Sequence, residues 1–85
     1  MIWHVELDNS VRKVLQRIPH KDADRIREVF RDFPQDPFEG DIVKLSGEEN
    51  SWRRRVGSYR IFFEIFTEQH VILIQELQCR GSKTY

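Results

Sequence analysis

Arginines dominate the segment from Trp52 to Arg60, whose residue types point most directly to chemistry. Gly57 and Ser58 suit a two-residue type II′ turn, so we expect a β-hairpin in which Arg55 lies opposite Arg60. Like charges directly opposite each other on a sheet repel, and planar guanidinium groups match the oxygens of a phosphate. The segment therefore predicts a surface that binds phosphate.

Alternation of side chains along the two strands divides this hairpin into two faces. The residues expected on the core face are Trp52, Val56, Tyr59, Ile61, Phe63 and Ile65. The residues expected on the opposite face are Arg53, Arg55, Arg60, Phe62 and Glu64. Arg54 falls on the core face, where it either extends to the sheet edge or marks a bulge that shifts the register. The alternative to anion binding is that the arginines are solvated or pair with Glu64, Glu68 or Glu76.

Composition limits the classes to which the protein can belong. The 85 residues predict a single domain, residues 1–85, with a small core. No apolar run approaches the roughly 20 residues of a membrane span, and the first residues lack a signal-peptide pattern, so we expect a cytoplasmic protein. Cys79 is the single cysteine, and the three histidines lack metal-ligand spacing. We therefore expect no metal and no cofactor, with Cys79 a small buried or strand residue.

Charge is distributed unevenly along the chain, although the formal net charge is zero. Residues 1–50 carry eight basic against eleven acidic residues, and residues 51–85 carry six against three. A zero total argues against a nucleic-acid binder, whereas a basic second segment indicates a local electrostatic surface that the total conceals.

Apolar spacing upstream of the hairpin predicts the elements that position it. Residues 2–7 favour a short strand, and any residue from Asp8 to Ser10 can cap a following helix. Two helices are expected, one ending at Pro19 and one running from Lys21 or Asp22 to Pro34. Their apolar stripes are Val11, Val14, Leu15 and Ile18, then Ile26, Val29, Phe30 and Phe33. The charged side of this helical hairpin is either a solvated surface or a partner surface.

The remaining segments complete an α+β domain. Residues 36–40 predict a loop that ends at Gly40 and places Phe38 at the core edge. Residues 42–45 favour a short strand or an extended segment, and a last strand runs from about Val71 to Leu77. The order is β-α-α-β-β-β with an additional extended piece before the hairpin. It predicts an N-terminal helical hairpin on one face of a small, mostly antiparallel sheet, with the arginines on the open face.

The whole chain resembles a toxin of the RelE/ParE superfamily from type II toxin–antitoxin modules. The matching pieces are the helical hairpin, Asp36-Pro37-Phe38, Lys44-Leu45-Ser46-Gly47, residues 52–60 and the ending from Cys79-Arg80 to Tyr85. The resemblance implies a compact RelE-like toxin that is held inactive by an antitoxin encoded beside it. In the RelE branch, which we favour, the implied activity is cleavage of mRNA in the ribosomal A site. The implied partners are the antitoxin, the ribosome and mRNA, with no membrane.

The resemblance also implies which residues form the site. Arg53, Arg55 and Arg60 match basic positions of the family and would hold the extra negative charge on phosphorus. Arg80 matches a basic position near the C-terminus, and Tyr85 matches a terminal tyrosine that lies against a base or contributes to the site. The alternatives are a solvated terminal charge for Arg80 and a packing role for Tyr85.

Proton transfer is where the sequence departs from the family nucleases, which often supply lysine, glutamate or histidine. Arginine keeps its proton at any useful pH and is a poor base. Lys83 or Tyr85 is the remaining candidate acid, and Glu64 or Asp41 the remaining candidate base; Lys83 is otherwise a plain surface residue. Two rivals follow, a ParE-like poison of DNA gyrase and a non-catalytic toxin-fold protein that only binds its antitoxin.

Overall fold

The computed structural model describes residues 3–38, 40, 42–45, 47 and 50–79 of the chain. Its elements are β1 (His4–Leu7), α1 (Asn9–Arg17), α2 (His20–Asp32), β2 (Ile42–Lys44), β3 (Ser51–Val56), β4 (Tyr59–Phe66) and β5 (Val71–Cys79). The strands form one sheet in the order β1-β5-β4-β3-β2. β1 pairs with β5 in parallel, and the other neighbours are antiparallel. The predicted α+β fold is confirmed, and the extended piece before the hairpin is β2.

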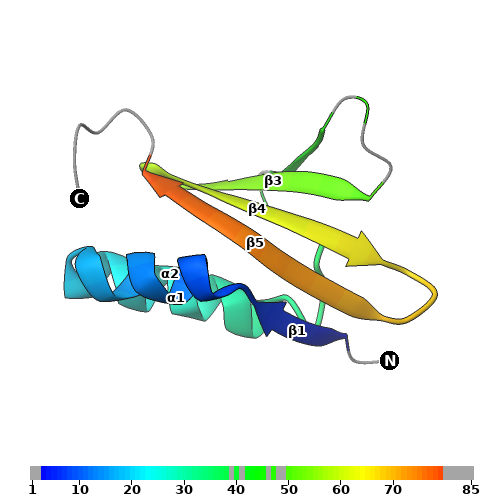
Figure 1. Cartoon of the computed structure of the whole chain (residues 1–85), viewed down its shortest axis with the longest axis horizontal. Coiled ribbons are helices and arrows are strands. Elements are labelled where there is room, and N and C mark those ends of the chain that lie inside the picture. Colours follow the sequence, from blue (N-terminus) through cyan, green and yellow to red (C-terminus); the bar gives the residue numbers. More distant parts are fainter. Residues whose placement is uncertain (1–2, 39, 41, 46, 48–49, 80–85) are drawn as a thin grey trace.

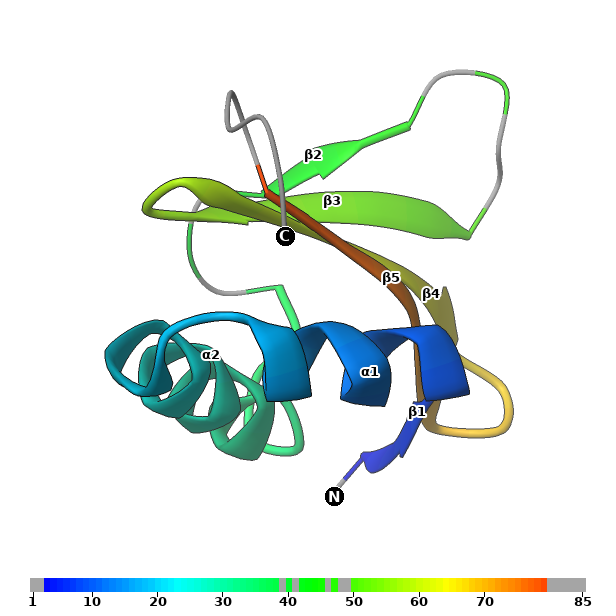
Figure 2. The ribbon, with the colours of Figure 1, turned by 60° about the vertical axis from the view of Figure 1, so that its left-hand side comes forward.

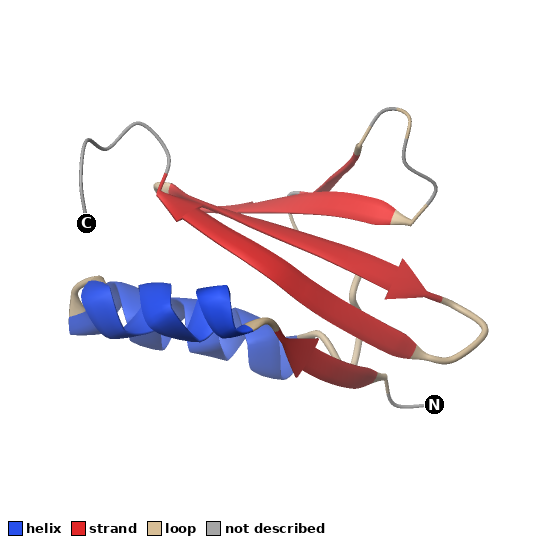
Figure 3. Cartoon of the chain, viewed as in Figure 1, coloured by secondary structure: helices blue, strands red, loops and turns tan. Residues whose placement is uncertain are grey.

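The molecule has two layers. Figure 1 shows α1 and α2 below the sheet, and Figure 2, turned by 60°, shows both helices on that same side. The secondary-structure colouring of Figure 3 shows the same separation, with no described helix over the opposite face of the sheet. The face of the sheet that carries the predicted arginines is therefore open within the described part of the chain.

Burial follows the two predicted periodicities. Helical residues Val11, Ile26 and Phe33 are fully buried against alternate residues of the central strands, such as Phe63. The Phe33 and Phe63 rings lie 5.0 Å apart between centroids. Fully burying a side chain of this size stabilises the fold by about 1.5–3 kcal/mol relative to its exposure. Every second residue of β4 is buried, so the core face predicted for this strand is confirmed.

The helix boundaries have local causes. Asp8 caps α1 because its carboxylate accepts a hydrogen bond from the Ser10 backbone N–H at 2.9 Å and one from the Ser10 hydroxyl at 2.6 Å. α2 begins at His20, earlier than the predicted Lys21 or Asp22. The reason is that Pro19 occupies the N-cap with φ −56°, and its carbonyl accepts the Ala23 N–H at 3.0 Å. One proline therefore ends α1 and starts α2.

The loop after α2 corrects one prediction. Phe38 does not enter the core edge, because its side chain is 46% exposed. Its ring contacts Trp52 edge-on at 5.6 Å and Trp3 at 6.4 Å. Pro37 is the fully buried residue of this loop, and the Phe38 N–H bonds the Asp36 carboxylate at 3.0 Å. This Asx turn directs the proline ring inward and the phenylalanine ring outward.

Tyr59 ties the sheet to the helical layer. Its ring is buried, and its hydroxyl donates a hydrogen bond of 2.6 Å to Asp22 in the first turn of α2. Gly57 has φ 58°, whereas Ser58 is absent from the described non-glycine residues with positive φ. This combination fits the predicted type II′ turn and excludes type I′, which needs positive φ at both positions. Tyr59 thus anchors the strand that follows the turn.

Truncating Tyr59 should mainly cost packing energy. We expect Tyr59→Ala to lose about 3–5 kcal/mol of unfolding free energy because a buried aromatic ring leaves a cavity. Tyr59→Phe should lose less, about 1.5–3 kcal/mol, since it removes the hydrogen bond to the Asp22 carboxylate and keeps the ring. Urea unfolding of both variants measures the loss from packing and the loss from the hydrogen bond. Equal losses would contradict the assignment of Tyr59 to the core.

The cap of α1 predicts a dependence of stability on pH. The Ser10 hydroxyl bond, and next the Ser10 N–H bond, hold the pKa of Asp8 below its usual value of 3.8. A carboxyl group with a lowered pKa in the folded state stabilises that state fully above its unfolded pKa, and this contribution is lost as the pH falls through the lowered value. Between about pH 5 and about pH 2, chemical unfolding should show a fall in the unfolding free energy of the wild type. Asp8→Asn caps the helix without ionising, so its unfolding free energy should lack this part of the fall. Parallel curves for the two proteins would count against it.

Candidate functional site

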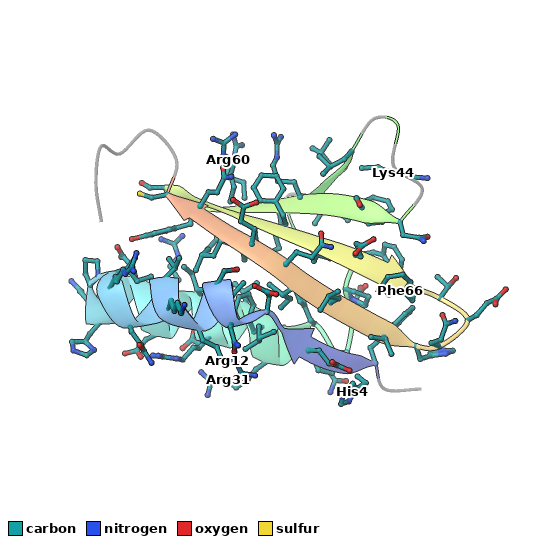
Figure 4. All side chains as sticks on the ribbon, in the orientation of Figure 1. His4, Arg12, Arg31, Lys44, Arg60 and Phe66 are labelled. Atoms are coloured by element: carbon teal, nitrogen blue, oxygen red, sulfur yellow. The ribbon has the colours of Figure 1, made fainter. Side chains whose placement is uncertain are left out.

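The arginine hairpin has the predicted register. Val56 pairs with Tyr59, Arg55 with Arg60, and Arg53 with Phe62. Val56 and Tyr59, which flank the two-residue turn, form a hydrogen-bonded pair. Pair types alternate along an antiparallel ladder, so Arg55 and Arg60 form a non-hydrogen-bonded pair, the closer type, with Cα atoms about 4.5 Å apart. Figure 4 shows Arg60 pointing away from the helices, on the open side of the sheet. The side chains of Arg55 and Arg60 therefore extend from directly opposite backbone positions toward the open side of the sheet.

The open face combines charge with apolar surface. In one row across the sheet, Gln78, Arg60 and Arg55 follow one another on β5, β4 and β3. In the next row, the residues from β5 to β2 are Glu76, Phe62, Arg53 and Val43. Rows that are two residues apart lie about 7 Å apart along the strands. Three arginines thus gather at the turn end of the face.

Acidic neighbours do not neutralise all of these arginines. Within the described part of the chain, Arg53 and Arg60 make no ion pair. The Glu64 carboxylate accepts a hydrogen bond from the Gln75 amide, and the Glu76 carboxylate accepts one from Gln78 at 2.7 Å. The alternative in which Glu64 or Glu76 pairs with Arg53 or Arg60 is therefore wrong. The Nε atoms of Arg54 and Arg60 are both buried without a hydrogen-bond partner among the described residues, so this property does not separate the two arginines.

Arg54 is part of the scaffold. Its Cζ lies 5.7 Å from the centroid of the Phe33 ring, a cation–π contact. A Cβ on Gly40 would lie 2.7 Å from this Cζ, so the guanidinium reaches the loop at the sheet edge. Of the two alternatives for Arg54, extension to the edge is correct and a bulge in the hairpin is wrong. The irregularity lies instead in the β4–β5 pairing, between Phe62 and Phe63.

Of the predicted proton-transfer groups, Glu64 is the one that lies in the described part of the chain. Glu64 is four residues from Arg60 on the same strand, about 13 Å along it, and already bonds Gln75. Glu76 lies nearer because it pairs with Phe62, in the row next to Arg60. Sequence reasoning weighed Glu76 only as an ion-pair partner, since its position depends on the irregular β4–β5 register. Asp41, Arg80, Lys83 and Tyr85 lie outside the described residues.

The helical layer carries a second concave surface, far from the arginines. A groove of about 730 Å³ lies between α1 and α2, and its lining includes Leu15, Phe30, Arg12, Arg31, Asp24 and Glu28. Figure 4 shows Arg12 and Arg31 on the side of the helices away from the sheet. Apolar floor residues and charges of both signs suit an amphipathic segment better than a phosphate.

The described residues offer neither a metal site nor a membrane-spanning helix. They contain no group of three or more histidine, cysteine or acidic side chains placed to hold a metal ion. None of the helices in that part of the chain has both the length and the apolar character needed to cross a membrane. The open face of the sheet is where the structure brings together the predicted Arg53, Arg55 and Arg60.

Comparison with known proteins gives consistent matches along the chain. A family model described as the ParE toxin of type II toxin–antitoxin systems, parDE, matches residues 2–82. A curated relative, toxin RelE1 of Methanocaldococcus jannaschii, is 24% identical over 83 residues. The match covers 94% of this chain and 92% of the relative.

Solved structures match over nearly the whole fold. The toxin in the archaeal RelE–RelB complex from Pyrococcus horikoshii OT3 has a TM-score of 0.84 and 28% identity, covering 98% of this chain and 100% of that one. The RelBE2 complex from Mycobacterium tuberculosis gives a TM-score of 0.80 at 22% identity, with 94% and 100% covered. The isolated RelE toxin of E. coli gives 0.78 at 12% identity, with 95% and 87% covered. The last two likenesses support the fold alone.

Proposed function

We propose that this chain, which belongs to the ParE toxin family of type II toxin–antitoxin systems, is a RelE-like endoribonuclease that cleaves mRNA in the ribosomal A site. The superfamily predicted from the sequence is confirmed by the family match and by the RelE structures. The activity within the superfamily is our proposal, supported by the RelE names of the relatives and by the arginine face.

One observation carries the proposal, namely that Arg60 lies opposite Arg55 on an open face with Arg53 in the next row. Neither Arg53 nor Arg60 makes an ion pair within the described residues. A scaffold alone would gain nothing from holding two guanidinium groups opposite each other, since such pairs are destabilising. Binding of a phosphate at this place offsets the repulsion and gives Arg60, which makes no ion pair within the described residues, an anionic partner.

The chemistry that fits this face is attack of a ribose 2′-oxygen on the neighbouring phosphorus. The O2′–P bond forms, the P–O5′ bond breaks, and the products end in a 2′,3′-cyclic phosphate and a 5′-hydroxyl. A base takes the 2′-hydroxyl proton and an acid gives a proton to the leaving 5′-oxygen. Arg60, with Arg55 and Arg53, would hold the charge that grows on the phosphoryl oxygens. Arg80, Lys83 and Tyr85 remain our candidates for completing the site.

The ribosome would supply what this face lacks. No described histidine or lysine accompanies the arginines on their face, and Glu64 lies about 13 Å along the strand from Arg60. Positioning of the 2′-hydroxyl in line with the scissile bond can contribute as much as about 7–11 kcal/mol. A toxin that lets the ribosome hold its substrate therefore needs weaker acids and bases of its own.

A second function has support from a specific observation. The family model is described by parDE, and poisoning of DNA gyrase, the ParE-like alternative, needs no proton-transfer groups. A toxin-fold protein that only binds its antitoxin remains the third class. In all three cases we propose a cognate antitoxin as partner, as in the RelE–RelB complexes, with an acidic or amphipathic segment covering the arginine face. We also propose a cytoplasmic location, where ribosomes and gyrase are found.

Substrate context separates the first two functions. We expect little cleavage of naked RNA and clear cleavage of the same mRNA on programmed ribosomes, because the face offers charge but few proton-transfer groups. Primer extension on both substrates measures this, and a supercoiling assay with purified gyrase serves as the parallel control. Efficient cutting of free RNA at the same sites would exclude ribosome dependence. Gyrase inhibition without RNA cleavage would establish the ParE-like alternative.

Substitution of Arg60 separates site from scaffold. Arg60→Ala should lower cleavage on ribosomes by at least about 100-fold, the cost of removing one oxyanion-stabilising donor. Its melting temperature should stay within about 4 °C of wild type, since the change relieves repulsion and leaves no described partner unpaired. Arg60→Lys should also lose much activity because it keeps the charge without the two-pronged geometry.

Arg17→Ala is the matched control, because it removes an exposed arginine at the end of α1 that makes no ion pair with another described residue. Cell-growth assays, cleavage assays and thermal melts on the three variants decide the question. Full toxicity of Arg60→Ala, or a loss of toxicity that follows a large fall in melting temperature, would make Arg60 a scaffold residue.

A further inference from the structure

Phe62 is an aromatic side chain on the charged face of the sheet. It lies two residues after Arg60 on β4 and directly opposite Arg53 on β3. Unlike its neighbours Ile61 and Phe63, which are 0% and 1% exposed, it is half-buried and turned to the open side. By the alternation along the hairpin, Arg53 and Phe62 form a closer, non-hydrogen-bonded pair like Arg55 and Arg60. A flat apolar surface thus sits beside guanidinium groups, in the row next to the arginine pair.

This combination of groups matches the two halves of a nucleotide. Arg53 and Arg60, which make no ion pair with another described residue, can bind the negative phosphate, and an aromatic ring accepts the flat face of a base. The arginine pair and Phe62 are one row apart, about 7 Å along the strands, a separation that a sugar and its phosphate can span. Val43, 45% exposed on the far side of Arg53, extends the apolar surface.

We propose that Phe62 is the stacking platform for a nucleobase of single-stranded RNA whose phosphate is held by Arg60 and Arg53. The proposal rests on the proposed function, and it assigns a base-binding subsite to the same face. Stacking on an aromatic ring is tolerant of base identity, because every base has a π-face. Phe62 therefore contributes affinity and orientation for RNA with little choice among the four bases.

Charge argues against a purely apolar protein segment as the occupant of this patch, and the acidic antitoxin segment proposed above is the alternative that the experiment tests. A purely apolar segment would leave Arg53 and Arg60 without partners, whereas a nucleotide satisfies the ring and the guanidinium groups together. Phe66, on the same face of β4, gives the internal comparison. It pairs with Val71, far from the arginines, and is also half-buried. It has the same ring without the neighbouring charge, so it should not bind a nucleotide.

The experiment compares two probes and three variants of the full chain. The first probe is a short single-stranded RNA with 2′-O-methyl riboses, which cannot be cleaved; the second is inorganic polyphosphate, which has phosphates but no bases. Phe62→Leu should weaken RNA binding by about 5- to 100-fold, the range for loss of one stacked base, and leave polyphosphate binding unchanged. Phe66→Leu should change neither affinity, and Arg60→Ala should weaken both. Calorimetry gives the dissociation constants, and melting temperatures confirm folding.

A second readout does not depend on affinity. In Phe62→Trp the introduced indole should be quenched by RNA and not by polyphosphate, relative to the quenching of Trp3 and Trp52 in the wild-type chain. Equal effects of Phe62→Leu on both probes, no effect on RNA, or absence of indole quenching would overturn the subsite. Loss of binding only to an acidic antitoxin peptide would overturn it too, in favour of a protein occupant.

The outcome is separate from that of the proposed function. If wild type cleaves mRNA on programmed ribosomes and Phe62→Leu binds RNA normally, the subsite is wrong and the nuclease stands. If Phe62→Leu loses RNA affinity selectively while wild type cleaves nothing on ribosomes, the subsite stands and the nuclease is wrong.

Discussion

The register of the β3–β4 hairpin is the constraint on which the rest of this structure depends. A slip by one residue would exchange the two faces of β4, sending Ile61 and Phe63 to solvent and Arg60 into the core. The Gly57-Ser58 turn sets that register locally, and the buried Tyr59 fixes it against α2 through Asp22. The magnitudes show why the arrangement holds. Opposed like charges cost a share of about 0.2–1 kcal/mol, whereas each large core residue contributes about 1.5–3 kcal/mol. The core therefore stabilises a face whose own side chains repel one another.

Local patterns in the sequence were enough to predict most of this architecture. Turn chemistry at Gly57 and period-two alternation gave the hairpin register and the shared face of Arg53, Arg55 and Arg60, because both depend on neighbours along the chain. Features that depend on distant strands were beyond reach. The parallel pairing of β1 with β5 and the shift between Phe62 and Phe63 have no local signal.

The same limit applies to the candidate site. Whether Glu64 and Glu76 neutralise arginines depends on Gln75 and Gln78, whose amides take those carboxylates once β5 is in place. The inward turn of Pro37 instead of Phe38 was also missed, because both residues are apolar and only the Asx turn at Asp36 decides which ring enters the core.

The parallel pairing of β1 with β5 has a consequence for how the protein is made. His4 meets Val71 and Leu7 meets Ile74, so the first described strand finds its neighbour only after β5 has been translated and has left the ribosome. Until then β1 has no described neighbour in the sheet. Pairing of β1 with β5 closes a loop of more than sixty residues, between His4 and Val71, and closing so long a loop is slow and entropically costly. During synthesis, β3 and β4 of the arginine hairpin are translated before β5, the strand that links them to β1. Folding to the complete sheet thus comes after translation of β5, the last described strand along the chain.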